Sequence, residues 1–337
     1  MDSVFVVGGT RFIGRHAVEE FLDHDYHVTI FNRGTHENPF ADTEHVHHIE
    51  GDRTDDKALL AAAREVDPDV VIDCVAYKPR DVRQAVEIFG GAEAYVYVSS
   101  GAAYGREDLP KREDETPLEP CSEKEAADDT WKTYGARKAE GDRAVFEAAE
   151  RGIRAMSVRP PVVYGPHDYT ERFAYWVNRV RTQDRIVVPG DGTNLWQRVY
   201  VEDVASALRI VAEEGAAGEA YNVGDRNATT LDDTIDLVED ALRDIGELDG
   251  EGPERVYASH RELSIADIDP DAVPCYRPQH PHLLDTHKIE QLGWAATPRA
   301  DAHGETVSSH VEHGLTGEDE GPSREDEERL LDVLDTV

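Results

Sequence analysis

The sequence predicts an α/β fold, in which a doubly wound parallel sheet is followed by a smaller lobe towards the C-terminus. Three observations lead to this prediction. Short apolar runs alternate with helix-length segments through the first half, a glycine-rich turn directly follows the first run, and the alternation becomes less regular after Pro160. At 337 residues, the chain is long enough for one large domain and an appended lobe, each with its own core.

Six strand-like runs alternate with helix-length segments through the first half, which is the rhythm of a parallel sheet. They are Val4–Val7, Val28–Phe31, Val46–Ile49, Val70–Asp73, Tyr95–Val98 and Ile153–Val158. The longer segments between them predict crossover helices at Arg15–His24, Asp56–Glu65, Arg80–Phe89 and Thr133–Glu150. We therefore expect a Rossmann-type domain over residues 1–162. Tyr221–Val223, within the segment 199–225, predicts a late strand that returns to the same sheet.

The rest of the chain divides by composition. Two segments, 163–198 and 226–315, predict a second lobe. Residues 106–131 are acidic and contain prolines, so we expect a surface loop there that could gate a ligand. Residues 316–337 form an acidic tail, which we expect to be a solvated helix or a frayed end.

The composition is strongly acidic, because 71 Asp and Glu against 35 Lys and Arg give a formal charge of −36. Such a charge repels phosphate backbones, so nucleic acid is not expected as a partner. It also exceeds what solubility requires and indicates a halophilic protein in a high-salt cytoplasm, where molar salt shortens the Debye length to about 3 Å. The first residues form neither a basic n-region nor a long apolar stretch, so we expect a cytoplasmic protein without a membrane segment.

The cysteines and histidines do not predict a metal site. The three cysteines, Cys74, Cys121 and Cys275, lie far apart without a CxxC spacing, so neither a disulfide framework nor a zinc site is expected. The histidines group at 45–48 and at 280–287, but no carboxylate or cysteine at ligand spacing completes either group.

The first turn reads Val7-Gly-Gly-Thr-Arg-Phe-Ile-Gly14 and leads from the first strand directly into a helix. Gly8 permits a tight turn and a close approach of the backbone to a pyrophosphate, and Gly14 permits close helix packing. The N-terminus of the helix offers N–H groups and positive potential to an anion. A glycine-rich turn in this place therefore predicts a dinucleotide phosphate site.

Tyr134 and Lys138 are four residues apart on one expected helix, so their side chains share a face. A nearby ammonium favours the phenolate form of a tyrosine and makes it a usable acid or base near neutral pH. The spacing alone is common on solvated helices. Because it stands downstream of a phosphate loop and of Ser99-Ser100, which follow the fifth strand, it indicates hydride-transfer chemistry.

Seven segments, in this order, resemble those of the extended short-chain dehydrogenases/reductases, the family of NAD(P)-dependent epimerases and dehydratases that act on nucleotide sugars. They are Gly8–Gly14, Gly51–Arg53, Tyr97–Ser100 with Tyr104-Gly105, Tyr134 with Lys138, Arg159–Pro166, Tyr221–Gly224, and Arg277 with Leu292–Trp294. Gly8–Gly14 and Arg277–His280 also resemble a branch that contains the chloroplast stem-loop-binding proteins, which have moved toward RNA. Those relatives lack the Tyr/Lys pair that this chain keeps.

The resemblance implies roles for individual residues. Tyr134 would exchange the substrate hydroxyl proton, Lys138 would hold the nicotinamide ribose, and Ser100 would hydrogen-bond the reacting oxygen. NAD or NADP would be held by Gly8, Thr10, Arg11, Phe12, Ile13, Gly14, Asn32, Arg33, Asp52, Arg53, Ala76 and Lys138. Relatives often dimerise through the helices beside the Tyr/Lys segment, so a homodimer is also implied.

Two departures from the family pattern favour NADP over NAD. The middle glycine of the triplet is Arg11 here, and the acidic residue that usually closes the second strand is Asn32, followed by Arg33. An Asp would accept the ribose 2′-hydroxyl and repel a 2′-phosphate, whereas two arginines could pair with that phosphate. Two surface arginines beside abundant carboxylates remain the alternative. Asp52 fits an adenine contact or a helix cap before Thr54–Ala58.

The substrate-binding residues that the resemblance implies lie outside the first domain. Arg277 matches the arginine that clamps a sugar-nucleotide pyrophosphate, while the second clamp position holds Trp196, with Arg198 two residues further on. An offset of two along a strand changes the reach of Arg198. Trp196 and Tyr164 are the aromatic candidates for a ligand cleft. The other tryptophans are expected to pack inside the protein: Trp131, Trp176 and Trp294.

We therefore expect an NAD(P)-dependent sugar-nucleotide epimerase-type enzyme that uses Tyr/Lys/Ser hydride-transfer chemistry. Dehydratases of the family carry an acid/base pair just after the active serine or threonine, but this chain has Ser100-Gly-Ala, so a 4,6-dehydratase is not expected. Two alternatives remain. One is an NADP-dependent reductase or dehydrogenase of a small carbonyl or sugar substrate, and the other is a non-catalytic nucleotide-sensing or RNA-binding scaffold.

Overall fold

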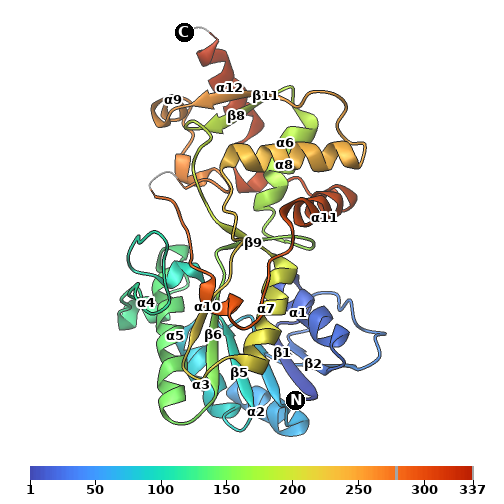
Figure 1. Cartoon of the computed structure of the whole chain (residues 1–337), viewed down its shortest axis with the longest axis vertical. Coiled ribbons are helices and arrows are strands. Elements are labelled where there is room, and N and C mark those ends of the chain that lie inside the picture. Colours follow the sequence, from blue (N-terminus) through green and yellow to red (C-terminus); the bar gives the residue numbers. More distant parts are fainter. Residues whose placement is uncertain (278–279, 336–337) are drawn as a thin grey trace. The chain divides into compact units, whose positions relative to one another are not determined.

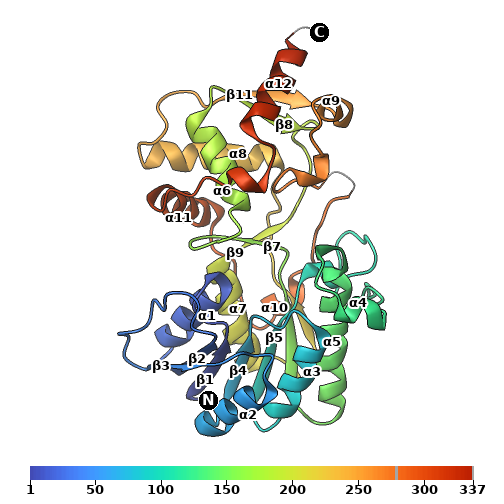
Figure 2. The same cartoon turned by 180° about the vertical axis from the view of Figure 1, so that it is seen from behind.

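The computed structural model of the chain describes residues 1–277 and 280–335, which form two compact units (Figures 1 and 2). Unit 1 comprises Met1–Val163, Val201–Gly224 and Leu284–Ala296. Unit 2 comprises Tyr164–Tyr200, Asp225–Leu283 and Thr297–Val337. The chain therefore passes between the units several times, as expected for a late strand that returns to the first domain.

Unit 1 is built on a seven-stranded sheet in the order β10-β6-β5-β4-β1-β2-β3, and every paired strand is parallel. The strands are β1 (Ser3–Val7), β2 (His27–Asn32), β3 (Val46–Glu50), β4 (Val70–Asp73), β5 (Ala94–Val98), β6 (Ala155–Arg159) and β10 (Ala220–Asn222). The predicted α/β class is thus confirmed. The strand order changes direction between β1 and β4, and in open parallel sheets ligands bind beyond the carboxyl ends of the strands at such a point.

Helices cover both faces of this sheet (Figures 1 and 2). The helices of unit 1 are α1 (Phe12–Asp23), α2 (Asp56–Val66), α3 (Pro79–Ile88), α4 (Glu123–Ala127), α5 (Tyr134–Glu150), α7 (Val201–Glu214) and α10 (His287–Glu290), with short 3-10 turns η1 (Gly101–Ala103) and η2 (Trp131–Thr133). Leu59 of α2, Val82 of α3 and Val145 of α5 share one core with the sheet residues Phe5 and Tyr95. Helices α1 and α7 pack against each other on the other face.

The segment 106–131, expected to be a loop, contains α4 and is anchored to other parts of unit 1. The backbone N–H of Asn222 on β10 donates to Glu113 Oε1 at 2.8 Å. Arg112 Nε donates to Asp285 Oδ2 at 2.9 Å. These contacts connect the segment to the edge strand of the sheet and to a stretch far along the chain.

Residues 284–296 were expected in the second lobe, but they belong to unit 1. Their apolar side chains explain the difference, because Ile289 and Trp294 are buried there. The indole Nε1 of Trp294 donates to the carbonyl of Asp203 on α7 at 2.9 Å, which satisfies its polar atom within the core.

Unit 2 contains further helices and a small parallel sheet formed by β8 and β11. Its elements are α6 (Arg172–Thr182), β8 (Arg185–Pro189), β9 (Arg198–Tyr200), α8 (Leu231–Asp244), β11 (Glu254–Ala258), α9 (His260–Ile265), η3 (Pro270–Ala272), α11 (Arg299–Glu312), η4 (Glu318–Glu320) and α12 (Arg324–Leu334). Strand β7 (Val162–Tyr164) stands where the chain first leaves unit 1.

The acidic tail was expected to be solvated or frayed, but its helix α12 is packed within unit 2. Glu327 of α12 is buried and forms an ion pair with the buried Arg179, with Nε and Oε2 2.7 Å apart. Tyr175 Oη donates to the same carboxylate at 2.8 Å, and Leu330 and Leu331 are also buried. Buried apolar side chains and a satisfied charge therefore hold this helix in place.

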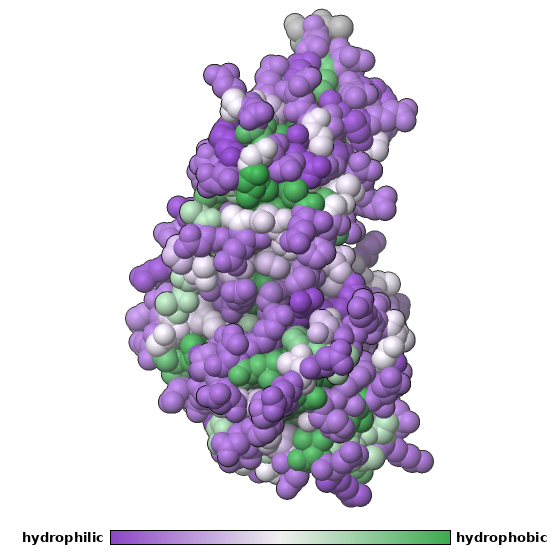
Figure 3. Space-filling view, turned by 90° about the vertical axis from the view of Figure 1, so that its right-hand side faces the viewer, coloured by the Kyte–Doolittle hydropathy of each residue, from purple (hydrophilic) through white to green (hydrophobic). Residues whose placement is uncertain are grey.

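Hydrophilic residues dominate the face drawn in Figure 3, in agreement with the large acidic excess. None of the helices within residues 1–277 and 280–335 is both long enough and apolar enough to cross a membrane.

Candidate active site

The glycine-rich loop between β1 and α1 has a geometry that only glycine permits at two positions. Gly8 has φ +93°, and a Cβ there would lie 2.6 Å from Val75 Cγ1. A Cβ on Gly14 would lie 2.0 Å from the carbonyl oxygen of Gly8, so the helix packs directly onto the loop. Arg11 in the middle position has φ −137°, an extended conformation that any residue adopts, which explains why a side chain is tolerated there.

The N-terminus of α1 fits an anionic group. Among the described residues, the N-cap residue Arg11 makes no side-chain hydrogen bond to the N–H groups of the helix. The first turn of the helix contains no acidic residue. Phe12, which begins the helix, has φ +39°, in the left-handed region that a bulky residue rarely adopts. Thr10 and Ile13 are half-buried beside it. A tight loop that leads into an uncapped helix of 12 residues is the arrangement that holds a dinucleotide pyrophosphate.

Asn32, at the end of β2, uses its side chain within the protein. Its Oδ1 accepts from the backbone N–H of Gly34 at 2.8 Å and lies 3.1 Å from His48 Nε2. Its Nδ2 donates to Thr10 Oγ1 at 3.2 Å. Asn32 therefore links the glycine-rich loop to the end of the second strand, and its acceptor oxygen already has two neighbours.

Two basic side chains lie close to this strand end. Arg33 directly follows Asn32 and is exposed. Arg11 Nη1 lies 3.2 Å from Nε2 of His36, a residue that sequence reasoning did not single out. Two arginines therefore lie near the end of β2.

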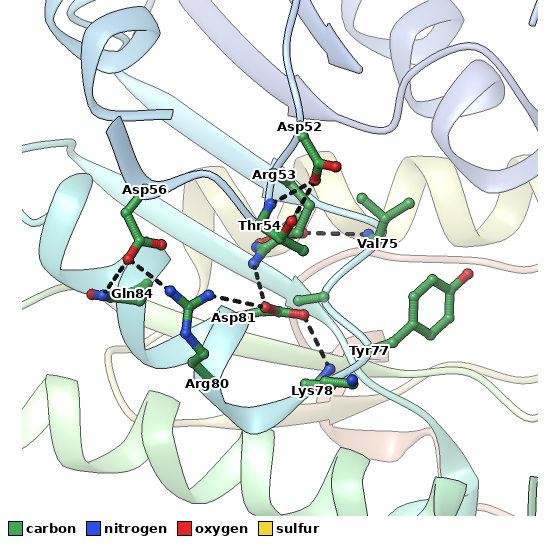
Figure 4. Close-up of polar contacts among 12 residues, drawn as sticks. Asp52, Arg53, Thr54, Asp56, Val75, Tyr77, Lys78, Arg80, Asp81 and Gln84 are labelled. Carbon is green, nitrogen blue, oxygen red and sulfur yellow. Dashed lines mark hydrogen bonds and ion pairs between the residues drawn. The ribbon is translucent and has the colours of Figure 1, made fainter. Parts of the chain in front are cut away.

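Asp52 follows β3 and forms a local turn. Its Oδ1 accepts from the backbone N–H and the hydroxyl of Thr54, at 2.8 and 2.7 Å (Figure 4). The bonds from Thr54 are the main cause that lowers the pKa of Asp52 below its usual value. The alternative interpretation of Asp52 as the helix cap is wrong, because the N-cap of α2 is Asp55, whose Oδ1 accepts from the N–H groups of Lys57 and Ala58.

Arg53 is predicted to contact the coenzyme, and in the structure its guanidinium lies in the interior of unit 1. It forms an ion pair with Asp73 at the end of β4. Its Nη1 also lies 3.4 Å from Asp81 Oδ1 at the start of α3 (Figure 4). Tyr95 Oη also donates to Asp73 Oδ2, at 3.0 Å. The two buried carboxylates offset the cost of burying this charge, while Nε and Nη1 of Arg53 have no hydrogen-bond partner among the described residues.

Lys138 on α5 is buried at the carboxyl ends of β4 and β5. Its Nζ donates to the carbonyls of Ala76 at 3.1 Å and Val98 at 2.8 Å. Burial lowers the pKa of Lys138 to about 8, although Asp73 and Asp142 act in the opposite direction. The ammonium therefore sits where removal of its proton is easier than in water.

Three tyrosine rings surround this ammonium. Nζ of Lys138 lies 4.7 Å from the ring centroid of Tyr97, 5.2 Å from that of Tyr77 and 5.8 Å from that of Tyr134. The electron-rich faces of aromatic rings attract a cation, so the rings offset part of the cost of burying the charge. Tyr77 and Tyr97 were not predicted as site residues, and only their positions after or within strands β4 and β5 could have indicated them.

Ser100 and Tyr134 come from two elements that pack tightly together. Ser100 follows β5, is 9 % exposed, and accepts from the backbone N–H of Ala102 at 3.1 Å, which caps η1. Tyr134 begins α5. A Cβ on the next residue, Gly135, would lie 2.4 Å from the carbonyl oxygen of Ala102, so a glycine is needed where α5 meets η1. Ser100, Tyr134 and Lys138 are thus carried by β5, η1 and the first turns of α5.

The remaining predicted residues belong to unit 2. Arg277 and Trp196 meet at His282, since Arg277 Nη1 lies 3.2 Å from His282 Nδ1 and Trp196 forms a parallel bridge with His282. Arg198 is 4 % exposed, and its Nε and Nη1 have no hydrogen-bond partner among the residues that the structure describes. A buried guanidinium with open donors is suited to an anion. Pro278 and Gln279, in the stretch that follows Arg277, lie outside the described residues.

Tyr164 was expected at a ligand cleft, but it is a core residue of unit 2. Only 2 % of it is exposed, and its ring stacks on Phe173 with centroids 5.4 Å apart. Its hydroxyl lies 3.3 Å from Nδ1 of the buried His303. The aromatic cluster of Tyr164, Phe173 and His303 explains why the ring is directed inward.

Trp131 was expected to pack inside the protein, but it is 75 % exposed. It stands in η2, directly before Tyr134 and α5. The other two tryptophans for which packing was expected, Trp176 and Trp294, are buried.

A family model for the NAD dependent epimerase/dehydratase family matches residues 4–224. Among curated proteins, the chain is 27 % identical over 241 residues to the chloroplast stem-loop binding protein of 41 kDa b from Arabidopsis thaliana, a match that covers 68 % of this chain and only 60 % of that protein. It is 28 % identical over 253 residues to the low-salt glycan biosynthesis protein Agl12 from Haloferax volcanii, covering 66 % of this chain and 76 % of that protein.

Solved structures share the fold. A dTDP-glucose 4,6-dehydratase from Bacillus anthracis, in complex with NAD, has a TM-score of 0.71 at 20 % identity, with 93 % of this chain and 97 % of that chain covered. A UDP-glucose 4-epimerase from Thermotoga maritima, with UDP-glucose, has a TM-score of 0.70 at 20 % identity, with 92 % and 99 % covered. At such identities the likeness concerns the fold alone.

Proposed function

The chain belongs to the NAD dependent epimerase/dehydratase family, and on that premise we propose that it is an NADP-dependent enzyme of the sugar-nucleotide epimerase type. The observation that carries this proposal is the meeting of β5, η1 and α5, which brings Ser100, Tyr134 and the buried Lys138 to the carboxyl end of the sheet. The glycine-rich loop opens at the same end of the sheet, after β1.

The residues around the strand ends fit a nicotinamide dinucleotide. Its pyrophosphate would lie at Gly8–Gly14 and the N-terminus of α1, its adenosine beside Asn32, Arg33 and Asp52, and its nicotinamide ribose beside Lys138. When bound, this coenzyme supplies a carbon that accepts and returns a hydride.

Asn32 supports NADP rather than NAD. An acidic residue at this position would accept the 2′-hydroxyl of the ribose, but the side-chain oxygen of Asn32 is already approached by Gly34 and His48. Arg11 and Arg33 offer positive charge nearby, and a 2′-phosphate is the group that such charge attracts.

Tyr134 is proposed as the acid and base of the reaction. Its phenolate takes the proton of a substrate hydroxyl, and its phenol returns a proton when the resulting carbonyl is reduced again. The ammonium of Lys138 stabilises the phenolate, while the hydroxyl of Ser100 donates to the reacting oxygen and holds it in place.

The substrate is proposed to be a nucleotide sugar, the class to which dTDP-glucose and UDP-glucose belong in the names of the two enzymes of similar fold. The open donors of Arg198 support a ligand that carries negative charge, and Arg277 and Trp196 are the other proposed contacts. Because Ser100 is followed by glycine and alanine, no acid/base pair for elimination stands at that place, which favours epimerisation over dehydration.

The test distinguishes the candidate functions by whether the sugar is isomerised and whether the coenzyme is oxidised or reduced. Purified protein is incubated with UDP-glucose or dTDP-glucose in molar KCl, with isomers followed by NMR and coenzyme by absorbance. We expect isomer interconversion without net coenzyme turnover. Net oxidation or reduction of added NADP(H) would identify a reductase or dehydrogenase instead. Binding of dinucleotide or RNA without either reaction would favour the non-catalytic scaffold. The similarity to a stem-loop binding protein is the reason to include RNA in this test.

Tyr134→Phe is the matched control for the chemistry. It removes one hydroxyl and leaves the ring, so we expect folding and coenzyme binding to be retained while the rate falls by at least about 100-fold. A variant that turns over at the wild-type rate would remove Tyr134 from the reaction.

A further inference from the structure

We propose that Trp131 is a positioning residue for Tyr134, holding the phenol ring in the orientation from which it exchanges protons with the substrate. This inference rests on the proposed function of Tyr134. It adds a residue from η2 that neither the sequence pattern nor the family resemblance indicated.

The contact between the two rings is a face-to-face stack. Their centroids are 4.6 Å apart and their planes differ by 16°. Nζ of Lys138 lies 5.8 Å from the centroid of the same tyrosine ring. A flat indole against one face of the ring limits rotation of the Tyr134 side chain and so restricts where its hydroxyl can point.

The place of Tyr134 in the chain brings it next to Trp131. It is the first residue of α5, and the helix begins without a side-chain cap from Thr133, as the described residues have it. An aromatic neighbour from the preceding turn is therefore well placed to fix the ring plane.

The turn that carries Trp131 is itself held firmly. The guanidinium of Arg137, one helical turn into α5, donates through Nη2 to the carbonyl of Thr130 at 3.0 Å and through Nε to Thr133 Oγ1 at 3.3 Å. Its Nη1 donates to the carbonyl of Tyr77 at 2.8 Å. Thr133 Oγ1 also donates to Asp128 Oδ2 at 3.0 Å. The residues on both sides of Trp131 are thus fixed to α5, and the indole can transmit this rigidity to Tyr134.

Because Trp131 is 75 % exposed, its replacement removes the stack without opening a cavity in a core. Three variants separate the possible roles. Trp131→Leu keeps apolar bulk but no flat ring, Trp131→Phe keeps a flat ring, and Lys132→Ala alters an exposed neighbour in the same turn. Thermal unfolding of each variant shows whether the fold is kept.

Loss of an aromatic stack changes an equilibrium by about two- to tenfold. We therefore expect Trp131→Leu to lower kcat for the UDP- or dTDP-sugar that the wild type converts by about tenfold, with KM for sugar and coenzyme changed less than about twofold. Trp131→Phe should restore most of kcat, and Lys132→Ala should match the wild type. If Trp131→Leu keeps the wild-type kcat, or raises KM alone, positioning by Trp131 is refuted.

A spectroscopic measurement tests the inference without turnover. In protein with labelled tyrosine, the ring protons of Tyr134, assigned with Tyr134→Phe, lie in the shielding region of the stacked indole. We expect them to move downfield in Trp131→Leu and much less in Trp131→Phe. Unchanged resonances would overturn the inference even if the enzyme is active. Conversely, a wild-type rate in Tyr134→Phe, or no reaction in the wild type, would overturn the proposed function. The NMR shifts would still show whether Trp131 stacks on Tyr134.

Discussion

The buried ammonium of Lys138 makes the stability of the protein depend on pH in a way that can be worked out. Its pKa is about 8 in the folded protein, against 10.5 for an ordinary lysine, because burial disfavours the charged form. Between these two values the unfolded chain holds more protons than the folded one at this site. The buried ammonium therefore lowers the free energy of unfolding most below pH 8. This destabilisation decreases as the pH rises towards 10.5.

Replacing Lys138 by methionine removes this dependence. A depression from 10.5 to about 8 corresponds to about 3 kcal/mol when the group is fully charged. Loss of the hydrogen bonds to Ala76 and Val98 opposes the gain, but that loss changes little with pH. The stability of Lys138→Met relative to the wild type should thus fall by about 2 to 3 kcal/mol between pH 7 and pH 10.

Urea unfolding of both proteins, at matched KCl and without added dinucleotide, measures the difference in unfolding free energy at each pH. Lys132→Met serves as the control, since it removes an exposed lysine near the same helix. The reasoning would be refuted by a Lys138→Met difference that stays constant from pH 7 to pH 10. If the unfolding free energy of Lys138→Met relative to the wild type increased with pH, the ammonium would stabilise the fold and not destabilise it.

Four other predictions follow from single features. Asn32→Asp should shift the preference from NADP towards NAD by at least about tenfold in Kd, measured by titration, because a carboxylate accepts the 2′-hydroxyl of the ribose and repels a 2′-phosphate; a wild type that binds NAD with a lower Kd than NADP would refute the NADP proposal. Gly135→Ala should destabilise the protein by about 1 to 3 kcal/mol and lower kcat, because its Cβ would lie 2.4 Å from the carbonyl of Ala102; wild-type Tm and kcat would contradict the tight contact. Arg198→Met should raise the unfolding free energy by about 1 to 3 kcal/mol while raising KM for a nucleotide sugar, since it removes a buried charge with open donors; lower stability would indicate a partner for the charge within the fold. Raising KCl to molar concentration should increase Tm strongly, because screening weakens the repulsion within a chain of charge −36; a flat response would remove the halophilic interpretation.

The parts of the fold that the sequence revealed are those in which local pattern and burial agree. Strands such as β4, buried on both faces, leave continuous apolar runs, and their alternation with helices predicts a parallel sheet. Helix α5 and the glycine-rich loop could be placed for the same reason. The segment 284–296 could not, because its place in unit 1 depends on two apolar residues, Ile289 and Trp294, that meet partners far away in the sequence.

At the site, residue types were predicted more reliably than the directions of their side chains. Arg53 pairs with Asp73 and Asp81, Tyr164 packs on Phe173, and Trp131 faces solvent. The direction of each side chain depends on which charged group or aromatic ring the fold places next to it. A single sequence contains the residues but not these pairings.

The measurement that tests the central claim most directly is a crystal structure of the protein with NADP⁺ bound. We predict that the pyrophosphate lies against Gly8–Gly14, that the 2′-phosphate lies near Arg11 and Arg33, and that the nicotinamide lies beside Ser100, Tyr134 and Lys138. A dinucleotide bound elsewhere, or a nicotinamide out of reach of the Tyr134 hydroxyl, would contradict the claim that these three side chains carry hydride-transfer chemistry.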